Sequence, residues 1–450
     1  MRDKEKMARR GTMTMGTRRP GRSSAVGLVV MMASVLVTPM RVPAPVAAAQ
    51  LRRLPRPPLA AGMARVSRGV PPTVVYAWGF NQYGQLGIGS LSYSNMPLAV
   101  STIGGVVALA GGGNSSLALK RDGTVWAWGP NGRGELGPVR ATCATRYARF
   151  PCSDVPVQVR GLGGVVSVSA GSGHALALKG DGTVWAWGSD DYGELGDGVS
   201  GTGINRATPA RVPGLAHMRA IAAGTGSSLA VAGDGTVWAW GANIHNREDG
   251  TNNSSRPLRV PGLRDVVAVA GDFEYGLALR RDGTVWAWGT NGWGEQGDGH
   301  VDDSFHATPG RILHLTDIVA IASGGGGGLA LARDGTVWAW GSSPSDAQPR
   351  PLPARVRGLP PVTAIAAGAG FDLARARDGR VWAWGGDDYG ELGNGRSGGD
   401  SITPVLVQRL THVVAIAAGG WHGLALRVDV SARTRRAMVS TRPAPSTSAR

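Results

Sequence analysis

The sequence predicts an all-β fold, a seven-bladed β-propeller of four-stranded blades. A pentapeptide of the type Val-Trp-Ala-Trp-Gly occurs seven times in the 450 residues, at intervals of 44 to 59 residues. An Asp-Gly pair precedes six of the copies, and a second apolar run that ends in glycine also returns seven times. Repetition of a unit with about four short strands is typical of a propeller. The pentapeptides begin at Val75 (where Tyr76 replaces the first Trp), Val125, Val184, Val237, Val285, Val337 and Val381.

Each repeat unit contains four strand signals in a fixed order. In the second unit, the apolar runs 106–111 and 116–120 come first, and Asp122-Gly123 separates them from the pentapeptide. Asp-Gly between two apolar runs favours a tight hairpin, because its turn needs positive φ at both central positions. A glycine-rich loop and a proline-containing stretch follow, and proline at a strand's start favours the outer edge of a sheet. We expect the Trp rings to pack between blades, since the large face of one strand then meets a small face of the next blade.

The order of the units predicts how the propeller closes. The first unit has a Trp strand, residues 74–78, without the strands that precede it elsewhere, and the last unit, 413–428, lacks a Trp strand. We expect residues 74–78 to complete the last blade, because this pairing joins the ends of the ring and removes an open sheet edge. The propeller is therefore predicted to span residues 73–428.

The segments outside the propeller predict export. Residues 1–49 combine a basic start, a short apolar stretch and a final Ala-Ala-Ala, and are typical of a signal peptide cleaved near Gln50. A disordered basic leader with an incidental apolar run is the alternative. Residues 50–72 are rich in Pro and Arg and are predicted to form a linker, and residues 429–450 are predicted to form a disordered basic tail. No other segment is apolar enough to span a bilayer, and we expect a secreted or extracytoplasmic monomer without a transmembrane segment.

The net charge of +16 resides outside the predicted propeller. Residues 73–428 carry 28 Lys or Arg and 28 Asp or Glu, so the repeat body is neutral. Binding to nucleic acid depends on a cationic surface that faces the phosphates. The neutral body therefore argues against a nucleic-acid partner for the propeller.

Two cysteines, Cys143 and Cys152, lie in the longest loop between repeats. In an exported protein such a pair predicts a local disulfide, which stabilises by about 2–3 kcal/mol at most because the loop it closes is short. Two isolated cysteines do not supply the four ligands of a structural zinc site.

The sequence contains no catalytic or metal-binding motif. The eight histidines show no metal-ligand spacing, and there is no nucleophile elbow, phosphate-binding loop or dinucleotide fingerprint in its required context. The acidic loop 190–197 lacks the ligand spacing of a calcium site, and it recurs at 387–394, which is typical of a structural turn. We therefore expect no enzyme activity, no cofactor and no bound metal.

Residues 78–89 match the motif Trp-Gly-x-Asn-x-x-Gly-Gln-Leu-Gly-x-Gly, and residues 165–178 match the adjoining part of the same unit. These motifs resemble the regulator of chromosome condensation (alpha-tubulin suppressor-like) repeat family, and because export is predicted, the chain resembles the secreted bacterial type of that family. The resemblance spans residues 73–428 and implies a seven-bladed propeller. The chain departs from the family pattern at two places, because the Gly-Gln-Leu-Gly loop is decayed after Trp240 and absent after Trp340.

The resemblance also implies functions. The eukaryotic founder of the family is a guanine nucleotide exchange factor for a small GTPase. Other relatives are secreted bacterial propellers, including inhibitors of β-lactamase, which bind a protein through aromatic residues on one face. The predicted export and the neutral propeller favour the second group.

This comparison directs attention to the loop between the first two strands of each blade. One position there, two residues before the first Leu of the second strand, is Ser or Gly in some blades and aromatic or His in others. Such loops surround one mouth of the channel, where exposed aromatic side chains would form a binding surface. The alternative is that these rings pack in the core between blades. The predicted partner-binding residues are Phe273, Tyr275, Phe371, Trp421, His422 and His174.

The sequence thus predicts a non-enzymatic, exported scaffold that binds a protein or a cell-surface polymer through loops on one face. Two alternatives stay open, an exchange or regulatory factor for a small GTPase and a secreted enzyme inhibitor. Localisation separates the exchange factor from the other two. A mature N-terminus near Gln50 in the secreted fraction would indicate export, and full-length cytosolic protein would indicate the exchange-factor class.

Overall fold

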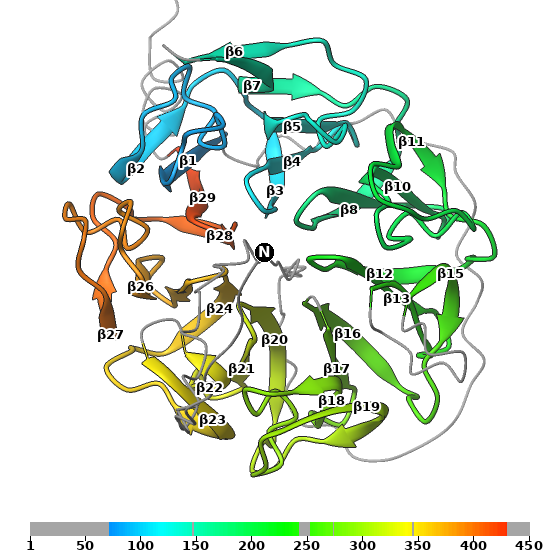
Figure 1. Ribbon diagram of the computed structural model, residues 1–450. Helices are drawn as coiled ribbons and strands as arrows, with labels where there is room; N and C mark the ends of the chain where they lie inside the picture. Colours follow the sequence, from blue (N-terminus) through cyan, green and yellow to red (C-terminus); the bar gives the residue numbers. More distant parts are fainter. Residues whose placement is uncertain (1–71, 146–147, 243–252, 273, 344–345, 430–450) are drawn as a thin grey trace, which may run out of the picture.

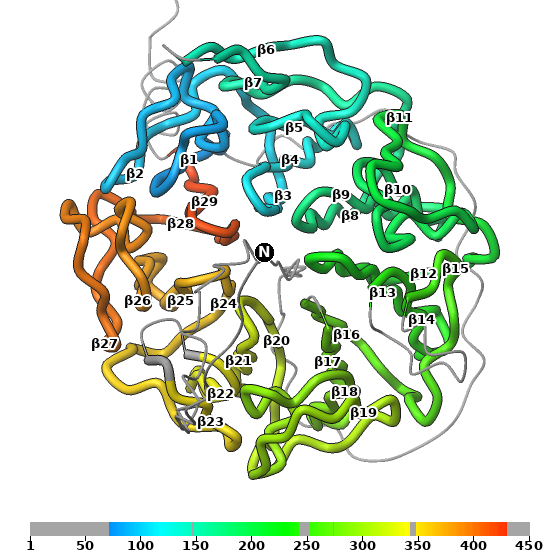
Figure 2. The backbone as a smooth tube through the Cα atoms, in the orientation of Figure 1, coloured from blue at the N-terminus to red at the C-terminus, as the bar shows by residue number. Residues whose placement is uncertain are grey.

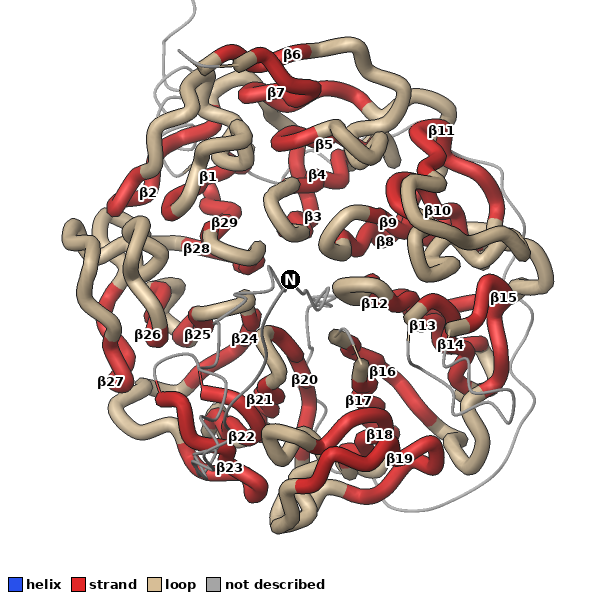
Figure 3. The backbone as a smooth tube through the Cα atoms, in the orientation of Figure 1, coloured by secondary structure: helices blue, strands red, loops and turns tan. Residues whose placement is uncertain are grey.

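Strands, turns and loops make up the part of the chain that the computed structural model describes, residues 72–145, 148–242, 253–272, 274–343 and 346–429 (Figure 3). Within these residues no helix is long and apolar enough to cross a membrane. The predicted signal peptide lies outside them, and so do the linker and the tail apart from residues 72 and 429. Export therefore stays a prediction.

Seven antiparallel sheets are arranged in a ring around one central axis and form the blades that the repeats predict (Figure 1). The innermost strands are β3 (Val106–Gly111), β8 (Val165–Ala170), β12 (Met218–Ala223), β16 (Val266–Gly271), β20 (Ile318–Gly324), β24 (Val362–Ala367) and β28 (Val413–Ala418). The second strands are β4 (Ser116–Lys120), β9 (His174–Lys179), β13 (Ser227–Ala232), β17 (Tyr275–Arg280), β21 (Gly327–Ala332), β25 (Phe371–Ala376) and β29 (His422–Val428).

The third strand of each blade, here called the Trp strand, carries the pentapeptide, and the proline-bearing strand is outermost as predicted. The Trp strands are β5 (Val125–Pro130), β10 (Val184–Ser189), β14 (Val237–Gly241), β18 (Val285–Asn291), β22 (Val337–Ser343), β26 (Val381–Gly385) and β1 (Thr73–Gly79). The outer strands are β7 (Arg149–Gln158), β11 (Asn205–Arg211), β15 (Ser254–Arg259), β19 (Asp302–Arg311), β23 (Asp346–Arg355), β27 (Ser401–Leu406) and β2 (Ser94–Val100).

The ring closes by pairing of the two ends of the repeat region, as the sequence predicts. β1 lies between β2 and β29 and is antiparallel to both. Val75 pairs with Leu426, and Trp78 pairs with Gly423. In Figure 2 the blue N-terminal strands therefore share a blade with the red C-terminal strands. This pairing occupies the edges that β1 and β29 would otherwise expose.

The second Trp of the pentapeptide fills the space between blades. Its ring is at most 5% exposed in every blade, and the ring of Trp128 leaves no room for a Cβ at Gly87 of the preceding blade. The first Trp is only half-buried. In two blades it lies near a lysine, with Lys179 Nζ 3.7 Å from the centroid of Trp185. The predicted packing role thus holds in full for the second rings, which are Trp78, Trp128, Trp187, Trp240, Trp288, Trp340 and Trp384.

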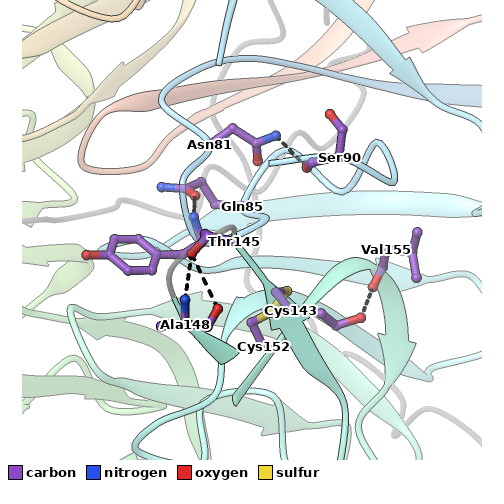
Figure 4. The surroundings of a disulfide bond; sticks show 10 residues. Asn81, Gln85, Ser90, Cys143, Thr145, Ala148, Cys152 and Val155 are labelled. Atoms are coloured by element: carbon purple, nitrogen blue, oxygen red, sulfur yellow. Dashed lines mark hydrogen bonds between the residues drawn. A yellow bond between two sulfur atoms is a disulfide. The ribbon is translucent and has the colours of Figure 1, made fainter. Parts of the chain in front are cut away.

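One blade has a fifth strand. β6 (Thr142–Ala144) pairs with β7 because the longest loop between repeats folds back as a hairpin. Cys143 on β6 and Cys152 on β7 form the predicted disulfide, with their Cα atoms 5.4 Å apart (Figure 4). Both cysteines are buried. The bridge therefore fixes this hairpin against the outer edge of its blade.

Two kinds of loop project from one face of the propeller, here called the loop face. Inner loops join the innermost strand to the second strand, and outer loops join the Trp strand to the outer strand. Because consecutive strands are antiparallel, both connections leave the sheet at the same end, and the Asp-Gly turns leave it at the other end. The loop face thus carries the inner loops in which partner-binding residues are predicted.

Candidate functional site

Most of the predicted partner-binding residues begin the second strand of their blade instead of standing in the inner loop. These are His174, Tyr275, Phe371 and His422, and each is at most 5% exposed. Trp421 lies in an inner loop and is partly exposed. Phe273 is outside the described residues.

The two histidines connect neighbouring blades. His422 Nε2 lies 2.8 Å from Ser116 Oγ, and His174 Nε2 lies 2.9 Å from Ser228 Oγ, in each case in the next blade. Burial lowers the pKa of both imidazoles to about 3, so both rings are neutral at pH 7. Their position is therefore that of hydrogen-bonded core residues.

The two aromatic rings at the same position also lie between blades. The Tyr275 hydroxyl donates a hydrogen bond to the carbonyl oxygen of Gly327 in the next blade. Phe371 belongs to a core cluster with Leu373 and Leu410. An exposed patch through these four side chains is therefore not what the structure shows, and they have the packing arrangement that was the alternative. The first residue of a second strand points between blades, which the apolar pattern around it could not distinguish from a loop position.

The outer loops contain an exposed set of side chains that sequence reasoning did not select. Each member precedes a Gly-Gln or Gly-Glu pair, and its backbone N–H donates a bond of 2.8–3.0 Å to the side chain of that Gln or Glu. The Tyr and Trp members are 37–44% exposed. The recurrence of aromatic residues at one position of the repeated loop was the signal that could have found them. The set is Tyr83, Arg133, Tyr192, Trp293 and Tyr389.

Five rings form a continuous row across three blades on the loop face, here called the aromatic cluster. Phe80 is 4.7 Å from Tyr389 and 6.0 Å from Tyr83 between ring centroids. The row continues at one end with Phe150, whose ring centroid is 5.8 Å from that of Tyr83, and at the other end with Tyr93, 6.3 Å from Tyr389. Tyr93 is 58% exposed, Tyr83 38% and Tyr389 37%. The cluster thus offers ring faces with hydroxyl groups, which suit contact with apolar groups and hydrogen-bonding groups together.

Trp421 is next to the aromatic cluster. Its carbonyl oxygen accepts a hydrogen bond of 2.7 Å from the backbone N–H of Phe80, and its ring lies over Gly370. Of the five predicted residues that the structure describes, Trp421 is therefore the one whose backbone is hydrogen-bonded to a member of the cluster. Within the described residues, no group of three or more His, Cys, Asp or Glu is arranged to hold a metal ion.

A sequence model of the RCC1-like domain matches residues 74–425, which is nearly the whole described propeller. The chain belongs to the RCC1-like domain family. Its RCC1-like domain is 32% identical over 176 residues to the probable E3 ubiquitin-protein ligase HERC6 of Homo sapiens, over 38% of this chain and 16% of that protein. It is 31% identical over 173 residues to the ultraviolet-B receptor UVR8 of Arabidopsis thaliana, over 37% of each chain.

A third relative, protein pim1 of Schizosaccharomyces pombe, is 32% identical over 190 residues, with 37% of this chain and 33% of pim1 covered. The chain thus spans less than two fifths of the length of these curated relatives. Among solved structures, Prp20p of Saccharomyces cerevisiae is 24% identical with a TM-score of 0.69, over 83% of this chain and 95% of Prp20p. Human WBSCR16 is 22% identical with a TM-score of 0.70, over 80% and 99%. Both structures show the shared propeller fold.

The outer loops of this RCC1-like propeller bury the Gln or Glu that holds their backbone. Burial raises the pKa of Glu135 to about 7 and that of Glu194 and Glu391 to about 8. Gln85 has the same place in its loop, and its neutral amide oxygen accepts the backbone N–H of Tyr83. The loop geometry therefore suits a neutral side chain at this position.

We expect Glu391→Gln to raise the melting temperature more at pH 8 than at pH 5. The pKa of Glu391 is raised from 4.5 to about 8 on folding, so the cost of keeping it protonated grows as the pH rises from 4.5 through 8. A neutral amide removes this cost, and at pH 5 little cost exists. Thermal unfolding at both pH values measures the difference, with Asp303→Asn as control, because Asp303 is an exposed carboxylate of β19 and belongs to a different blade. An equal gain at the two pH values would contradict the expectation.

Proposed function

We propose that this RCC1-like propeller is an exported, non-enzymatic scaffold that binds a protein partner through its loop face, with the aromatic cluster as the main contact. The observation that carries the proposal is the continuous row of rings from Tyr93 to Phe150, which crosses three blades and leaves its tyrosines 37–58% exposed. Monomeric proteins seldom expose contiguous apolar rings without a binding role.

Tyrosine-rich surfaces favour a protein partner. Tyrosine is enriched among the residues that dominate binding energy, because its ring buries a large area with few rotatable bonds. The backbone bonds from Tyr83 to Gln85 and from Tyr389 to Glu391 hold the loops in place before binding. Little conformational entropy is then lost on association, and more of the ring burial contributes to affinity.

Two observations support the finer parts of the proposal. The disulfide between Cys143 and Cys152 is of the kind that persists in oxidising compartments, which favours export over a cytosolic exchange factor. Prp20p is described as binding Gsp1p and histones, which are protein partners, and the same class of partner is proposed here. Inhibition of a secreted enzyme is one form that such binding could take.

A site-specific crosslink tests the proposal and identifies the partner. A photoreactive residue replaces Tyr93 in one variant and Tyr192 in the other. Tyr192 has the same exposure as Tyr389, 37%, but its ring is not part of the aromatic cluster. Each variant is irradiated in the extracellular fraction. We expect saturable capture of one protein from position 93 and none from position 192.

Tyr389→Ala is then expected to weaken binding of the captured protein by about 2 kcal/mol, roughly 30-fold, because truncation removes a ring from the centre of the contact. Tyr192→Ala serves as the matched control and should leave the affinity unchanged. Both variants should keep the melting temperature of the parent, since exposed rings contribute little to the core. Equal losses in the two variants, or no specific capture at position 93, would show that the cluster does not bind a protein.

A further inference from the structure

The outer loops are docked on the next blade by one repeated arrangement. In five junctions the carbonyl oxygen of the loop's Gln or Glu accepts a bond of 2.7–2.9 Å from the buried Trp of the next blade. The side chain that follows is at most 5% exposed and lies beneath the loop, and it is Leu86, Leu136, Leu195, Gln296 or Leu392. Each of these turns therefore fills the space between two blades, and it is here called a plug.

The glycine at the start of each plug lies against one position of the next outer strand. Gly84 packs on Asp154, Gly193 on Ser255 and Gly390 on Asn95, so closely that none of the three glycines has room for a Cβ. In each outer strand, one residue pairs with the glycine of the neighbouring Trp strand. The residue that follows it in the outer strand is the one that the plug covers. In β7, for example, Gly129 pairs with Ser153, and the covered residue is Asp154.

Among the described residues no plug lies between the blade of β20–β23 and the blade of β24–β27, which are neighbours in Figure 1. β22 ends at Ser343, β23 begins at Asp346, and the two strands pair at these ends, so only two residues separate them. In β27 the pairing of Gly385 with Ser401 makes Ile402 the residue that a plug would cover. Ile402 is 70% exposed, the largest exposure among the large apolar side chains of the described residues.

A cavity of about 210 Å³ occupies the position of the missing plug. Its apolar walls include Leu329, Trp340, Trp384 and Ile402, and its cationic wall includes Arg350 and Arg355. The Trp384 indole, which lacks the loop carbonyl present at five other junctions, donates its N–H to the Asp372 side chain instead. Asp372 on β25 pairs with the buried Trp of its blade, and the equivalent residues are Ser116 on β4 and Ser228 on β13. Asp372 thus replaces the hydrogen-bond acceptor that a plug would offer to Trp384. No side chain replaces the leucine of a plug, and its volume stays as the cavity.

We propose that this cavity, here called the plug socket, binds a leucine-bearing turn of a partner protein, of the type Gly-Glu-Leu-Gly. The leucine packs between Trp340 and Trp384 beside Ile402, and the acidic residues of the turn face Arg350 and Arg355. Docked turns of this chain show the complementary shape at five other junctions.

The sequence outside the described residues supports a partner in trans. Residues 1–71 and 430–450 contain no Gly-Gln-Leu-Gly or Gly-Glu-Leu-Gly, so they offer no such turn to their own socket. A second copy of this chain would first have to undock one of its own plugs. Tyr389 of the aromatic cluster belongs to the outer loop of the blade that carries Ile402, but this loop packs on Asn95 of β2, on the opposite side of the blade from the plug socket. The socket proposal therefore does not depend on the function proposed for the cluster.

A peptide copy of a docked plug tests the proposal. The probe has the sequence of residues 386–395, Gly-Asp-Asp-Tyr-Gly-Glu-Leu-Gly-Asn-Gly, and is titrated into the full-length protein by calorimetry. We expect saturable binding with one site per chain, and at least tenfold weaker binding of the same peptide with Asp in place of its Leu. No saturable binding of the parent peptide would overturn the proposal. Equal binding of the two peptides would overturn it as well, because it would indicate a site for acidic groups alone.

Protein variants place the binding at the socket. Ile402→Glu puts a carboxylate at the apolar rim and is expected to weaken peptide binding at least tenfold. Val199→Glu, at a 50% exposed apolar residue of another outer loop, is the matched control and should bind as the parent does. Both changed residues are exposed, so the fold should persist in each variant. Equal peptide affinity of the Ile402→Glu variant and the parent would overturn the assignment.

A plug supplied within the chain gives a second, independent test. Replacing residues 342–349, between Gly341 and its partner Arg350, with residues 386–400, between Gly385 and its partner Ser401, should fill the socket, abolish peptide binding and raise the melting temperature. Unchanged peptide affinity in the folded graft would overturn the proposal. Tyr389→Ala should bind the peptide like the parent, so a failure of the aromatic cluster and a failure of the plug socket are distinguishable.

Discussion

Deletion of residues 50–80 is expected to destabilise the propeller by several kcal/mol and to lower its melting temperature far more than deletion of residues 432–450. The first deletion removes β1, which lies between β2 and β29. Val75, Ala77 and Trp78 on this strand are all 0% exposed. Loss of one buried Trp side chain alone costs about 3–5 kcal/mol.

The loss of β1 also opens the ring. Seven backbone pairs with β29, from Thr73 with Val428 to Gly79 with His422, disappear, and the edge of β29 becomes free for pairing with other chains. Thermal unfolding followed by circular dichroism measures the two truncations, and light scattering measures association of the opened chain. Equal melting temperatures for the two truncated proteins would show that β1 does not close the propeller.

Phe371→Ala is expected to destabilise the protein by about 3–5 kcal/mol, because a fully buried ring leaves a cavity that its neighbours fill only in part. Phe371 is 0% exposed, and its core cluster includes Trp78, Leu373 and Leu410. It therefore contributes to the junction between the last two blades. Its large effect on stability would distinguish a core ring from a contact residue on the surface.

The matched control for Phe371→Ala is Tyr192→Ala, which removes a ring that is 37% exposed. We expect this change to alter the free energy of unfolding by about 0.5 kcal/mol or less. Denaturant unfolding with a constant m-value measures both variants. Similar stabilities for Phe371→Ala and the parent would mean that the ring is not packed as the structure shows.

The buried position of Phe371 also explains why the sequence did not predict the candidate site. The position two residues before the first Leu varies among Ser, Gly, His, Tyr and Phe, and in the sequence alone this variation resembles a surface signal. The structure shows that it follows from packing, since His422 reaches Ser116 of the next blade and Tyr275 reaches Gly327. Each junction accommodates a different pair of neighbours, so the residues at one position differ without any binding role.

The sequence by itself determined the repeat count, the strand order within a blade, the closure by residues 74–78 and the disulfide of Cys143 with Cys152. These features depend on local patterns: apolar runs, Asp-Gly turns and the spacing of like residues along one chain. Periodicity along the chain is preserved in the sequence, and the pentapeptide fixes which strand carries the large rings.

Only the tertiary structure decided which exposed rings lie together and which junction is open. Phe80, Phe150 and Tyr389 come from three different blades, and their distances depend on how loops pack across blade boundaries. The loop missing after Trp340 is visible in the sequence, but its consequence at Ile402 appears only when β27 is placed beside that gap. Contacts between blades join residues far apart in the chain, and no local pattern encodes the side chains that meet there.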